Sequence, residues 1–386
     1  MKKKVAILGS TGSIGNTLIN IIKKDKQNFE IVLLSAERNY KELLKQAKYF
    51  SVKNLIVTNY ESFLKIKKYK YSKNLKIFNS FDQFQKIFKT KVDYTMSSIT
   101  GIEGLKPTLE IIKYSKKIAI ANKESIICGW SLIEKELKKY KTKFVPVDSE
   151  HFSIWSVIKN NTEKNIDKVF ITASGGPFYN LPLSKFSKIK VKDAIKHPNW
   201  NMGKKISVDS ATMMNKVFEI IEAKNIFNIP INKLKILIHR DSYLHAIVKF
   251  NNGLSHMVIH DTNMKIPIFN TLYEKKNFYK LKKIDLKKLS KLNLEKPNLR
   301  KFPALKVFKK INSKKTLFET LIVTTNDALV NLFLEKKIKF AQITEIFFSI
   351  INDKKFSKYK SISPKNIDQI VKVKNIVQKK IKSIYT

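Results

Sequence analysis

Residues 5–22 read VAILGSTGSIGNTLINII, and this stretch decides the fold. The apolar residues Val5 to Leu8 run into glycines at positions 9, 12 and 15, and a helical pattern follows at once. Glycine lets the backbone approach a pyrophosphate closely, and the new helix offers the pyrophosphate free N–H groups and the positive end of its dipole. The pattern predicts a dinucleotide-binding turn rather than a plain tight turn. No G-K-[ST] motif is present, so an ATP-type phosphate loop is not expected.

The segment around this turn alternates short apolar stretches with amphipathic ones, which is typical of a parallel, doubly wound sheet. Beyond it, polar and glycine-containing motifs gather up to residue 275, a lysine-rich span follows, and the remainder has a helical pattern without glycine. We therefore predict an α/β fold in four parts. They are a Rossmann-like domain at 1–147, an α+β catalytic domain with a flap at 148–275, a linker at 276–300 and an α-helical domain at 301–386.

The composition is that of a folded protein, with 43% hydrophobic residues, but the formal charge is +45. A basic surface suits nucleic acid, yet arginine, the main base-reading residue, occurs only at Arg38, Arg240 and Arg300. We expect no nucleic-acid partner. We also expect no membrane association, because no apolar run approaches the ~20 residues of a bilayer span. The single cysteine excludes a disulfide within the chain. The apolar stretch near the start is too short for the core of a signal peptide, so we expect a cytoplasmic location.

Two further motifs follow apolar stretches in the first part. Glu37 and Arg38 come directly after IVLLSA, where a dinucleotide's ribose is bound, and an acid there favours a free 2′-hydroxyl while a base favours a 2′-phosphate. The sequence leaves that choice open. Asn122, Lys123 and Glu124 follow IAIA, at the edge where open α/β sheets bind ligands, although a charged first helical turn explains them equally well.

The stretch VPVDSEH (145–151) places Asp148 and Glu150 two residues apart. On an extended backbone residues i and i+2 point to the same side, so both carboxylates are expected to face one point. A hard divalent cation prefers such oxygen ligands. A third carboxylate is available on the helical pattern after Ser210, where Glu219 and Glu222 share a face with Asn215, and spacing hardly separates the two glutamates.

The stretch HPNWNMG (197–203) carries two large apolar residues, Trp200 and Met202, among residues that favour loops. Core residues normally lie on periodic elements, so we predict a flap that covers a ligand. Ser174-Gly175-Gly176, after another apolar stretch, suits a small anion-binding concavity. The serines, Asn215, Lys216 and His197 form a set suited to a phosphate.

With GSTGSIG, ANKES, PVDSEH, SGGPF and HPNWNMGKKISVDSATMMNK, the chain resembles the 1-deoxy-D-xylulose 5-phosphate reductoisomerase family almost from end to end. The resemblance implies a homodimer that binds NADPH and Mg²⁺ or Mn²⁺. It implies that the metal ligands are Asp148, Glu150 and Glu219, which selects Glu219 over Glu222. It implies substrate contacts at Lys123, Ser149, Glu150, Ser174, His197, Ser210, Asn215, Lys216 and Glu219, with Lys123 and the metal ligands catalytic. It implies nucleotide contacts at Thr11, Gly12, Ser13, Ile14, Glu37, Arg38, Asn39, Asn122, Glu124 and Gly203.

The implied reaction converts 1-deoxy-D-xylulose 5-phosphate into 2-C-methyl-D-erythritol 4-phosphate, by carbon–carbon bond rearrangement and hydride transfer, in the non-mevalonate route to isoprenoids. Two alternatives remain. One is a metal-assisted sugar-phosphate or semialdehyde dehydrogenase, which shares the glycine turn but needs no three carboxylates around one ion. The other is a basic nucleic-acid-binding protein. The chain also departs from the family pattern at HRDS (239–242), where the family usually has His-Pro-Gln-Ser.

Overall fold

The computed structural model describes residues 1–69, 74–159, 165–200, 202–273 and 285–385. The chain forms two compact units. Unit 1 comprises residues 1–125, 131–148 and 264–281, and unit 2 comprises residues 126–130, 149–263 and 282–386.

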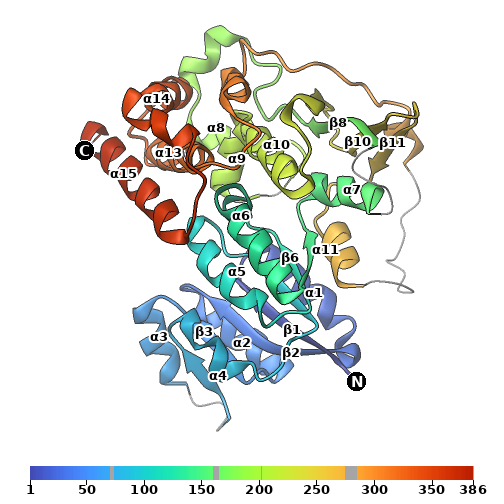
Figure 1. The fold of residues 1–386 in the computed structure, drawn as a ribbon, viewed down its shortest axis with the longest axis vertical. Coiled ribbons are helices and arrows are strands. Elements are labelled where there is room, and N and C mark those ends of the chain that lie inside the picture. The colour runs from blue at the N-terminus through green and yellow to red at the C-terminus, as the bar shows by residue number, and fades with distance from the viewer. Residues whose placement is uncertain (70–73, 160–164, 201, 274–284, 386) are drawn as a thin grey trace. The chain divides into compact units, whose positions relative to one another are not determined.

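Unit 1 is built on a seven-stranded sheet in which every strand pair is parallel, in the order β4-β3-β2-β1-β5-β6-β7 (Figure 1). The strands are β1 (Lys3–Leu8), β2 (Phe29–Ala36), β3 (Asn54–Val57), β4 (Lys76–Phe78), β5 (Tyr94–Ser97), β6 (Lys117–Ile120) and β7 (Lys143–Pro146). The order reverses at β1, with β2 on one side and β5 on the other. The predicted doubly wound arrangement is confirmed, and its ligand crevice is expected at this reversal.

The helices of unit 1 connect and cover these strands. They are α1 (Ser13–Lys23), α2 (Tyr40–Phe50), α3 (Tyr60–Lys67), α4 (Phe84–Ile87), α5 (Leu105–Ile112), α6 (Lys123–Tyr140) and α11 (Lys265–Leu272). One apolar core joins residues of β1, β2, α1 and α2 with Ile268 and Leu272 of α11. The short helix α11 therefore belongs to unit 1, although it lies inside the predicted catalytic segment 148–275.

Unit 2 contains a four-stranded mixed sheet in the order β11-β10-β8-β9. Its strands are β8 (Ile166–Ala173), β9 (Leu234–Ile238), β10 (Leu244–Phe250) and β11 (Ser255–Ile259), and only β8 and β9 pair in parallel. Against this sheet pack α7 (Ser149–Ile158) and α10 (Met214–Phe227), which share a buried apolar core with β8 and β10. Two short helices, α8 (Val191–Ala194) and α9 (Lys204–Ala211), precede α10.

The C-terminal part of unit 2 is helical, as predicted (Figure 1). After α12 (Leu286–Leu289), the main helices are α13 (Leu317–Leu334), α14 (Phe340–Asn352) and α15 (Ile367–Tyr385). Among the described residues, α13 alone has the length and apolar character of a membrane span, and 72% of that stretch is buried. The core helix of a globular unit meets the same criteria. The predicted boundary between catalytic and helical domains stays a prediction, and residues 276–284 of the predicted linker lie outside the described residues.

One local prediction needs correction. Residues 148–150 do not continue an extended strand, because α7 already begins at Ser149 and places Glu150 in its first turn. Serine and glutamate are favoured there by the unsatisfied N–H groups and the positive end of the helix dipole. Residues 204–211, between the predicted flap and α10, form α9.

The inner strand β10 carries a buried imidazole, His245. Its ring stacks on that of His260, with centroids 3.6 Å apart, and its Nε2 lies 3.0 Å from the His260 carbonyl oxygen. Burial, together with the neighbouring His260, lowers the pKa of His245 from its ordinary value of 6.5 to about 3. His245 is therefore neutral in the folded protein under conditions in which the unfolded chain binds a proton.

We predict that replacing Gly15 by alanine destabilises unit 1, whereas replacing Gly12 does not. A Cβ on Gly15 would lie 2.6 Å from the Ser10 Cα, which belongs to the backbone and cannot rotate away, whereas a Cβ on Gly12 would have its nearest neighbour at 3.5 Å. Overpacking of this kind costs about 1–3 kcal/mol. Urea denaturation without cofactor measures the difference, and equal midpoints for Gly15→Ala and Gly12→Ala would contradict this account of the turn.

We also predict that acid destabilises the protein partly through His245. Because its folded pKa of about 3 lies below the unfolded value of 6.5, the free energy of unfolding is highest above pH 6.5 and falls as the pH drops toward 3. One such group contributes a slope of up to about 1.4 kcal/mol per pH unit. His245→Gln should remove that slope in denaturation measured at several pH values, and the matched control His256→Gln, at an exposed position of β11, should retain it. Equal slopes in the two variants would be the contrary result.

Candidate active site

The glycine turn of unit 1 joins β1 to α1 at the carboxyl edge of the sheet. Gly9 has a φ of +80°, and a Cβ there would meet the Ser98 carbonyl oxygen at 2.9 Å, so β1 and the segment after β5 approach each other more closely than a side chain allows. Gly12 precedes α1 without any side-chain cap, and Gly12 and Ser13 are exposed. The first N–H groups of α1 are thus presented to solvent, which suits a pyrophosphate.

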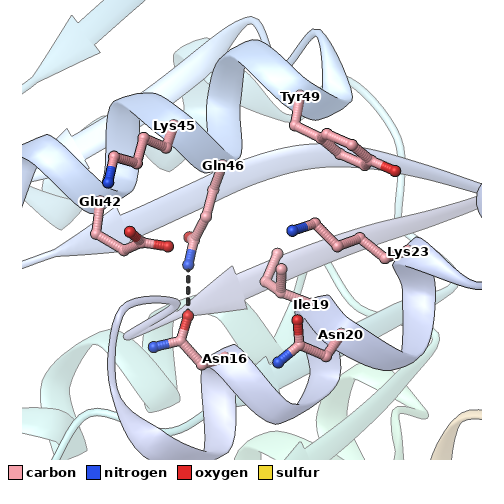
Figure 2. Close-up of a pocket in the computed structure, with 8 residues that line it drawn as sticks. All are labelled: Asn16, Ile19, Asn20, Lys23, Glu42, Lys45, Gln46 and Tyr49. Carbon is pink, nitrogen blue, oxygen red and sulfur yellow. Dashed lines mark hydrogen bonds between the residues drawn. The ribbon is translucent and has the colours of Figure 1, made fainter.

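A buried amide supports this turn from behind. Gln46 of α2 donates from Nε2 to the Ser10 carbonyl (3.2 Å) and to Oδ1 of Asn16 (2.8 Å), and Asn16 in turn donates to the Thr11 carbonyl (2.8 Å). In Figure 2 Gln46 reaches across to Asn16, and both side chains line a pocket formed by residues of α1 and α2. The cavity has a volume of about 230 Å³. The backbone of the turn is held by two amide side chains that the sequence analysis did not identify.

Glu37 and Arg38 follow β2 and pair with each other, with Arg38 Nε 3.1 Å from Glu37 Oε1. Both side chains are more than two-thirds exposed, so the pair is weak and opens at little cost. Asn39 caps α2 by accepting from the Glu42 N–H at 3.3 Å. At this position the structure provides an exposed guanidinium and an exposed carboxylate side by side.

Asn122 begins α6 after β6 and is almost fully buried. Its Oδ1 accepts from the Ser125 N–H (2.6 Å), and its Nδ2 donates to the carbonyls of Gly101 (2.8 Å) and Ile99. Asn122 therefore fastens the start of α6 to the segment after β5. The next residue, Lys123, forms an ion pair with Asp148, which follows β7. The parallel strands thus bring the predicted Lys123 and Asp148 together at the carboxyl edge, with the buried Glu124 beside them in sequence.

Unit 2 contains a buried ammonium between two carboxylates. Lys216 of α10 donates from Nζ to Glu150 Oε1 of α7 (2.8 Å) and to the Thr172 carbonyl (2.6 Å), and it forms an ion pair with Glu219 one turn along α10. Burial alone lowers the pKa of Lys216, but Glu150 and Glu219 outweigh burial, so its pKa is raised. The site is built to hold positive charge.

The two carboxylates are oriented by short polar contacts. Ser149 donates to Glu150 Oε2 (2.6 Å), and Asn215 donates from Nδ2 to Glu219 Oε1 (2.5 Å). Asp148 is the last residue of its segment of unit 1 and directly precedes Ser149 in the sequence. Carboxylate oxygens are the ligands that Mg²⁺ and Mn²⁺ prefer, so the donor set of unit 2 fits a hard divalent cation.

The alternative ligand Glu222 has a different environment. His151 of α7 lies between the two glutamates, with Nε2 2.8 Å from the Glu219 carbonyl oxygen and Nδ1 3.9 Å from Glu222 Oε2. Glu219 therefore shares Lys216 with Glu150, while Glu222 is directed to the imidazole. The sequence analysis did not assign a role to His151. Its position directly after Glu150 was the only feature of the sequence that pointed to a place near the site.

A second cluster in unit 2 is suited to an anion. His197 accepts at Nδ1 from the backbone N–H groups of Asn199 (3.1 Å) and Trp200 (3.0 Å), which places the proton of the neutral ring on Nε2. This Nε2 lies 3.1 Å from Ser174 Oγ, which also accepts from the Gly176 N–H at 3.1 Å. With both its acceptor positions used, Ser174 keeps its own O–H as a donor.

Burial first, and then the positive charges of Lys216 and Arg240, lower the pKa of His197 to about 4. His197 is thus a neutral hydrogen-bond donor near neutral pH. Ser210 lies in the last turn of α9 and packs against the same loop, since its carbonyl oxygen would lie 2.7 Å from a Cβ on Gly176. Gly203 directly precedes α9, and none of the described residues has an atom within 4 Å of a Cβ built on it.

The two predicted flap residues are partly buried and lie outside any helix or strand. Trp200 contacts the His245 ring edge-on, with centroids 6.2 Å apart. The segment is attached at one end through Asn199, whose Nδ2 donates to the Arg240 carbonyl (2.5 Å) and to Ser242 Oγ (2.8 Å).

Comparisons with known proteins identify the family of the chain. Residues 5–129 match the family description "1-deoxy-D-xylulose 5-phosphate reductoisomerase", and residues 144–227 and 260–380 match two descriptions of that family's C-terminal domains. The chain is 59% identical to the 1-deoxy-D-xylulose 5-phosphate reductoisomerase of Pelagibacter ubique (strain HTCC1062), over 99% of both chains. It is 37% identical to that of Sulfurihydrogenibium sp. (strain YO3AOP1), over 93% of both.

Solved structures of the family superpose on the whole chain. The reductoisomerase of Zymomonas mobilis in complex with NADPH matches with a TM-score of 0.89 and 29% identity, over 100% of this chain and 99% of that one. A DOX-P reductoisomerase in complex with NADPH, fosmidomycin and magnesium matches with a TM-score of 0.90 and 29% identity, over 99% and 98%. Since the identity to the Pelagibacter ubique relative extends over almost all of both sequences, this chain belongs to the 1-deoxy-D-xylulose 5-phosphate reductoisomerase family.

Proposed function

We propose that the protein converts 1-deoxy-D-xylulose 5-phosphate into 2-C-methyl-D-erythritol 4-phosphate with NADPH and a divalent metal, in isoprenoid synthesis. The observation that carries the proposal is the buried Glu150–Lys216–Glu219 cluster, present in the same unit as the Ser174–His197 anion cluster. Complexes of related chains with NADPH, fosmidomycin and magnesium support the same chemistry. The direct test is NADPH oxidation with 1-deoxy-D-xylulose 5-phosphate, with and without EDTA. Turnover that persists in EDTA, or occurs only with a semialdehyde, would favour an ordinary dehydrogenase.

We assign the metal to Asp148, Glu150 and Glu219. An ion held by these residues would polarise a substrate ketone and stabilise negative charge on its oxygen. The chain's own residues prepare this position: Ser149 and Asn215 hold the carboxylates of Glu150 and Glu219 in place. Lys123, paired with Asp148 at the carboxyl edge of unit 1, is assigned as a catalytic residue at the substrate.

We assign the substrate phosphate to the anion cluster of unit 2. Ser174 donates its O–H, His197 stays neutral and orients Ser174, and Lys216 supplies positive charge. Ser210 and Asn215, on either side of the turn between α9 and α10, complete the set. A phosphate held away from the reacting carbons supplies binding energy that orients them, and closure of Trp200 and Met202 as a flap would exclude water.

We assign the nucleotide to the glycine turn at Thr11, Gly12, Ser13 and Ile14, to the ribose side at Glu37, Arg38 and Asn39, and to Asn122, Glu124 and Gly203. Asn39 and Asn122 also cap helices, so substituting them would disturb the fold as well as the cofactor contact. The exposed Arg38 is available for a 2′-phosphate because its pairing with Glu37 is weak.

We further propose a cytoplasmic homodimer without a nucleic-acid or membrane partner. Strand β11 supports the dimer because it is the edge of the unit 2 sheet, and Met257 on it is 53% exposed. An edge strand with exposed apolar side chains is a template for pairing with a second copy. Sedimentation equilibrium would report the mass, and a monomer at micromolar concentration would count against the dimer.

We predict that Glu219→Gln abolishes metal-dependent turnover and weakens Mn²⁺ binding, whereas Glu222→Gln leaves both within about threefold of the parent protein. Glu219→Gln replaces a charged carboxylate ligand by a neutral amide, so we expect the metal affinity to fall by more than about tenfold. Glu222 lies near His151, so its replacement should have little effect on metal binding. Titration calorimetry with Mn²⁺, alongside melting temperatures as a control for folding, measures this. Loss of Mn²⁺ binding in Glu222→Gln alone would reverse the assignment.

We predict that NADPH is preferred to NADH and that Arg38→Ala narrows the ratio of their kcat/KM values by about tenfold, because a charge-assisted contact to phosphate is worth roughly 1.5–3 kcal/mol. The matched control is Glu37→Gln, which removes the neighbouring carboxylate and should widen the ratio. Steady-state kinetics with both nucleotides decides the matter. An unchanged ratio in Arg38→Ala would remove Arg38 from the 2′-phosphate site.

A further inference from the structure

Arg240 is one of only three arginines in the chain and lies in the turn between β9 and β10. Its Nη1 donates to the carbonyl oxygens of Ser174 and Gly176, the latter at 3.2 Å. Strands β8 and β9 are parallel neighbours that end at Ala173 and Ile238. The Ser174 loop and the Arg240 turn therefore leave the sheet side by side, and the guanidinium crosses from one to the other.

The guanidinium is itself fixed by an aromatic ring. Its carbon lies 4.8 Å from the centroid of the Tyr179 ring, within the range of a cation–π contact. The Tyr179 hydroxyl donates to Glu295, whose backbone pairs with Ile238 of β9 through hydrogen bonds of 2.7 and 3.0 Å. The Tyr179 ring that contacts Arg240 is thus connected to strand β9 through Glu295.

The loop between Ser174 and Gly176 has no space to move on either side. Gly175 has a φ of +76°, and a Cβ on it would lie 2.5 Å from Tyr179 Cδ2 and 3.2 Å from Arg240 Nη1. Gly176 has a φ of +68° and packs against the Ser210 backbone on the other side. With the carbonyls of Ser174 and Gly176 engaged by Arg240, the Gly176 N–H is left to orient Ser174 Oγ.

We propose that Arg240 is a positioning residue for substrate binding: its side chain fixes the Ser174–Gly176 loop so that Ser174 presents its hydroxyl to the substrate phosphate. This inference rests on the proposed role of Ser174. The guanidinium acts through two backbone carbonyls and needs no contact with the substrate.

The first test compares Arg240→Met, which removes every donor, with Arg240→Lys, which keeps the cation and part of the donor capacity. We expect Arg240→Met to lower kcat/KM for 1-deoxy-D-xylulose 5-phosphate by about tenfold, the effect of one charge-assisted hydrogen bond, and Arg240→Lys to recover part of it. NADPH affinity, measured by quenching of protein fluorescence, should stay within about twofold. Arg300→Met, at an exposed arginine, is the matched control and should change neither value. An unchanged kcat/KM in Arg240→Met, or an equal loss of NADPH affinity, would overturn the proposal.

The second test is a double-mutant cycle with Ser174→Ala. If Arg240 acts through this loop, Arg240→Met should cost much less in the Ser174→Ala background than in the parent protein, because the hydroxyl that it positions is already gone. If the losses in kcat/KM from Arg240→Met and Ser174→Ala simply multiply in the double variant, the proposal for Arg240 is overturned, while Ser174 keeps its assigned role at the phosphate. If Ser174→Ala alone leaves kcat/KM unchanged, the assignment of Ser174 to the phosphate is wrong, and the role of Arg240 fails with it.

Discussion

The buried ammonium of Lys216 between Glu150 and Glu219 is the constraint on which the rest of unit 2 depends. None of these three charges is tolerable alone in the interior, since removal of one partner of a buried pair costs about 3–5 kcal/mol. Helices α7 and α10 must therefore keep a fixed register, which the sheet beneath them and the His151 contact to the α10 backbone maintain. The packing of the unit and the geometry of its site follow from one electrostatic requirement.

The charge of Lys216 also affects its neighbour His197. Burial, together with the positive charges of Lys216 and Arg240, keeps the pKa of His197 low, so its ring is neutral. Neutral groups then perform the fine orientation: Ser149 and Asn215 on the carboxylates, and His197 on Ser174. A site that holds its own charges in fixed positions needs little rearrangement when a charged ligand arrives, which is the physical basis of electrostatic preorganisation.

Unit 1 obtains its site in a different way, from the topology of the backbone rather than from buried charge. All strands of a parallel sheet end at the same edge. This edge therefore carries three functional segments: the glycine turn after β1, the Glu37–Arg38 pair after β2 and the Asn122–Lys123 turn after β6. The tight approach of Gly9 to the segment after β5 marks the point where the strand order reverses. Long-range amide contacts from Gln46 and Asn122 then stiffen what the topology has brought together.

The sequence by itself determined the parallel sheet, the glycine turn and the helical C-terminal part, because these depend on local periodicity and on where glycine is required. It also indicated Asp148 and Glu150 as a pair, although it placed them on a strand, since a two-residue spacing does not show where a helix begins. Residue spacing left Glu219 and Glu222 equivalent, and the family resemblance selected Glu219. The tertiary structure adds a physical difference: both side chains are buried on one helix, but Glu219 pairs with Lys216 whereas Glu222 lies near His151 of α7. The contacts of Arg240 were also not visible in the sequence. Its partners Ser174, Gly176 and Tyr179 are more than 60 residues away in sequence, and the pairing of β8 with β9 brings the two segments together.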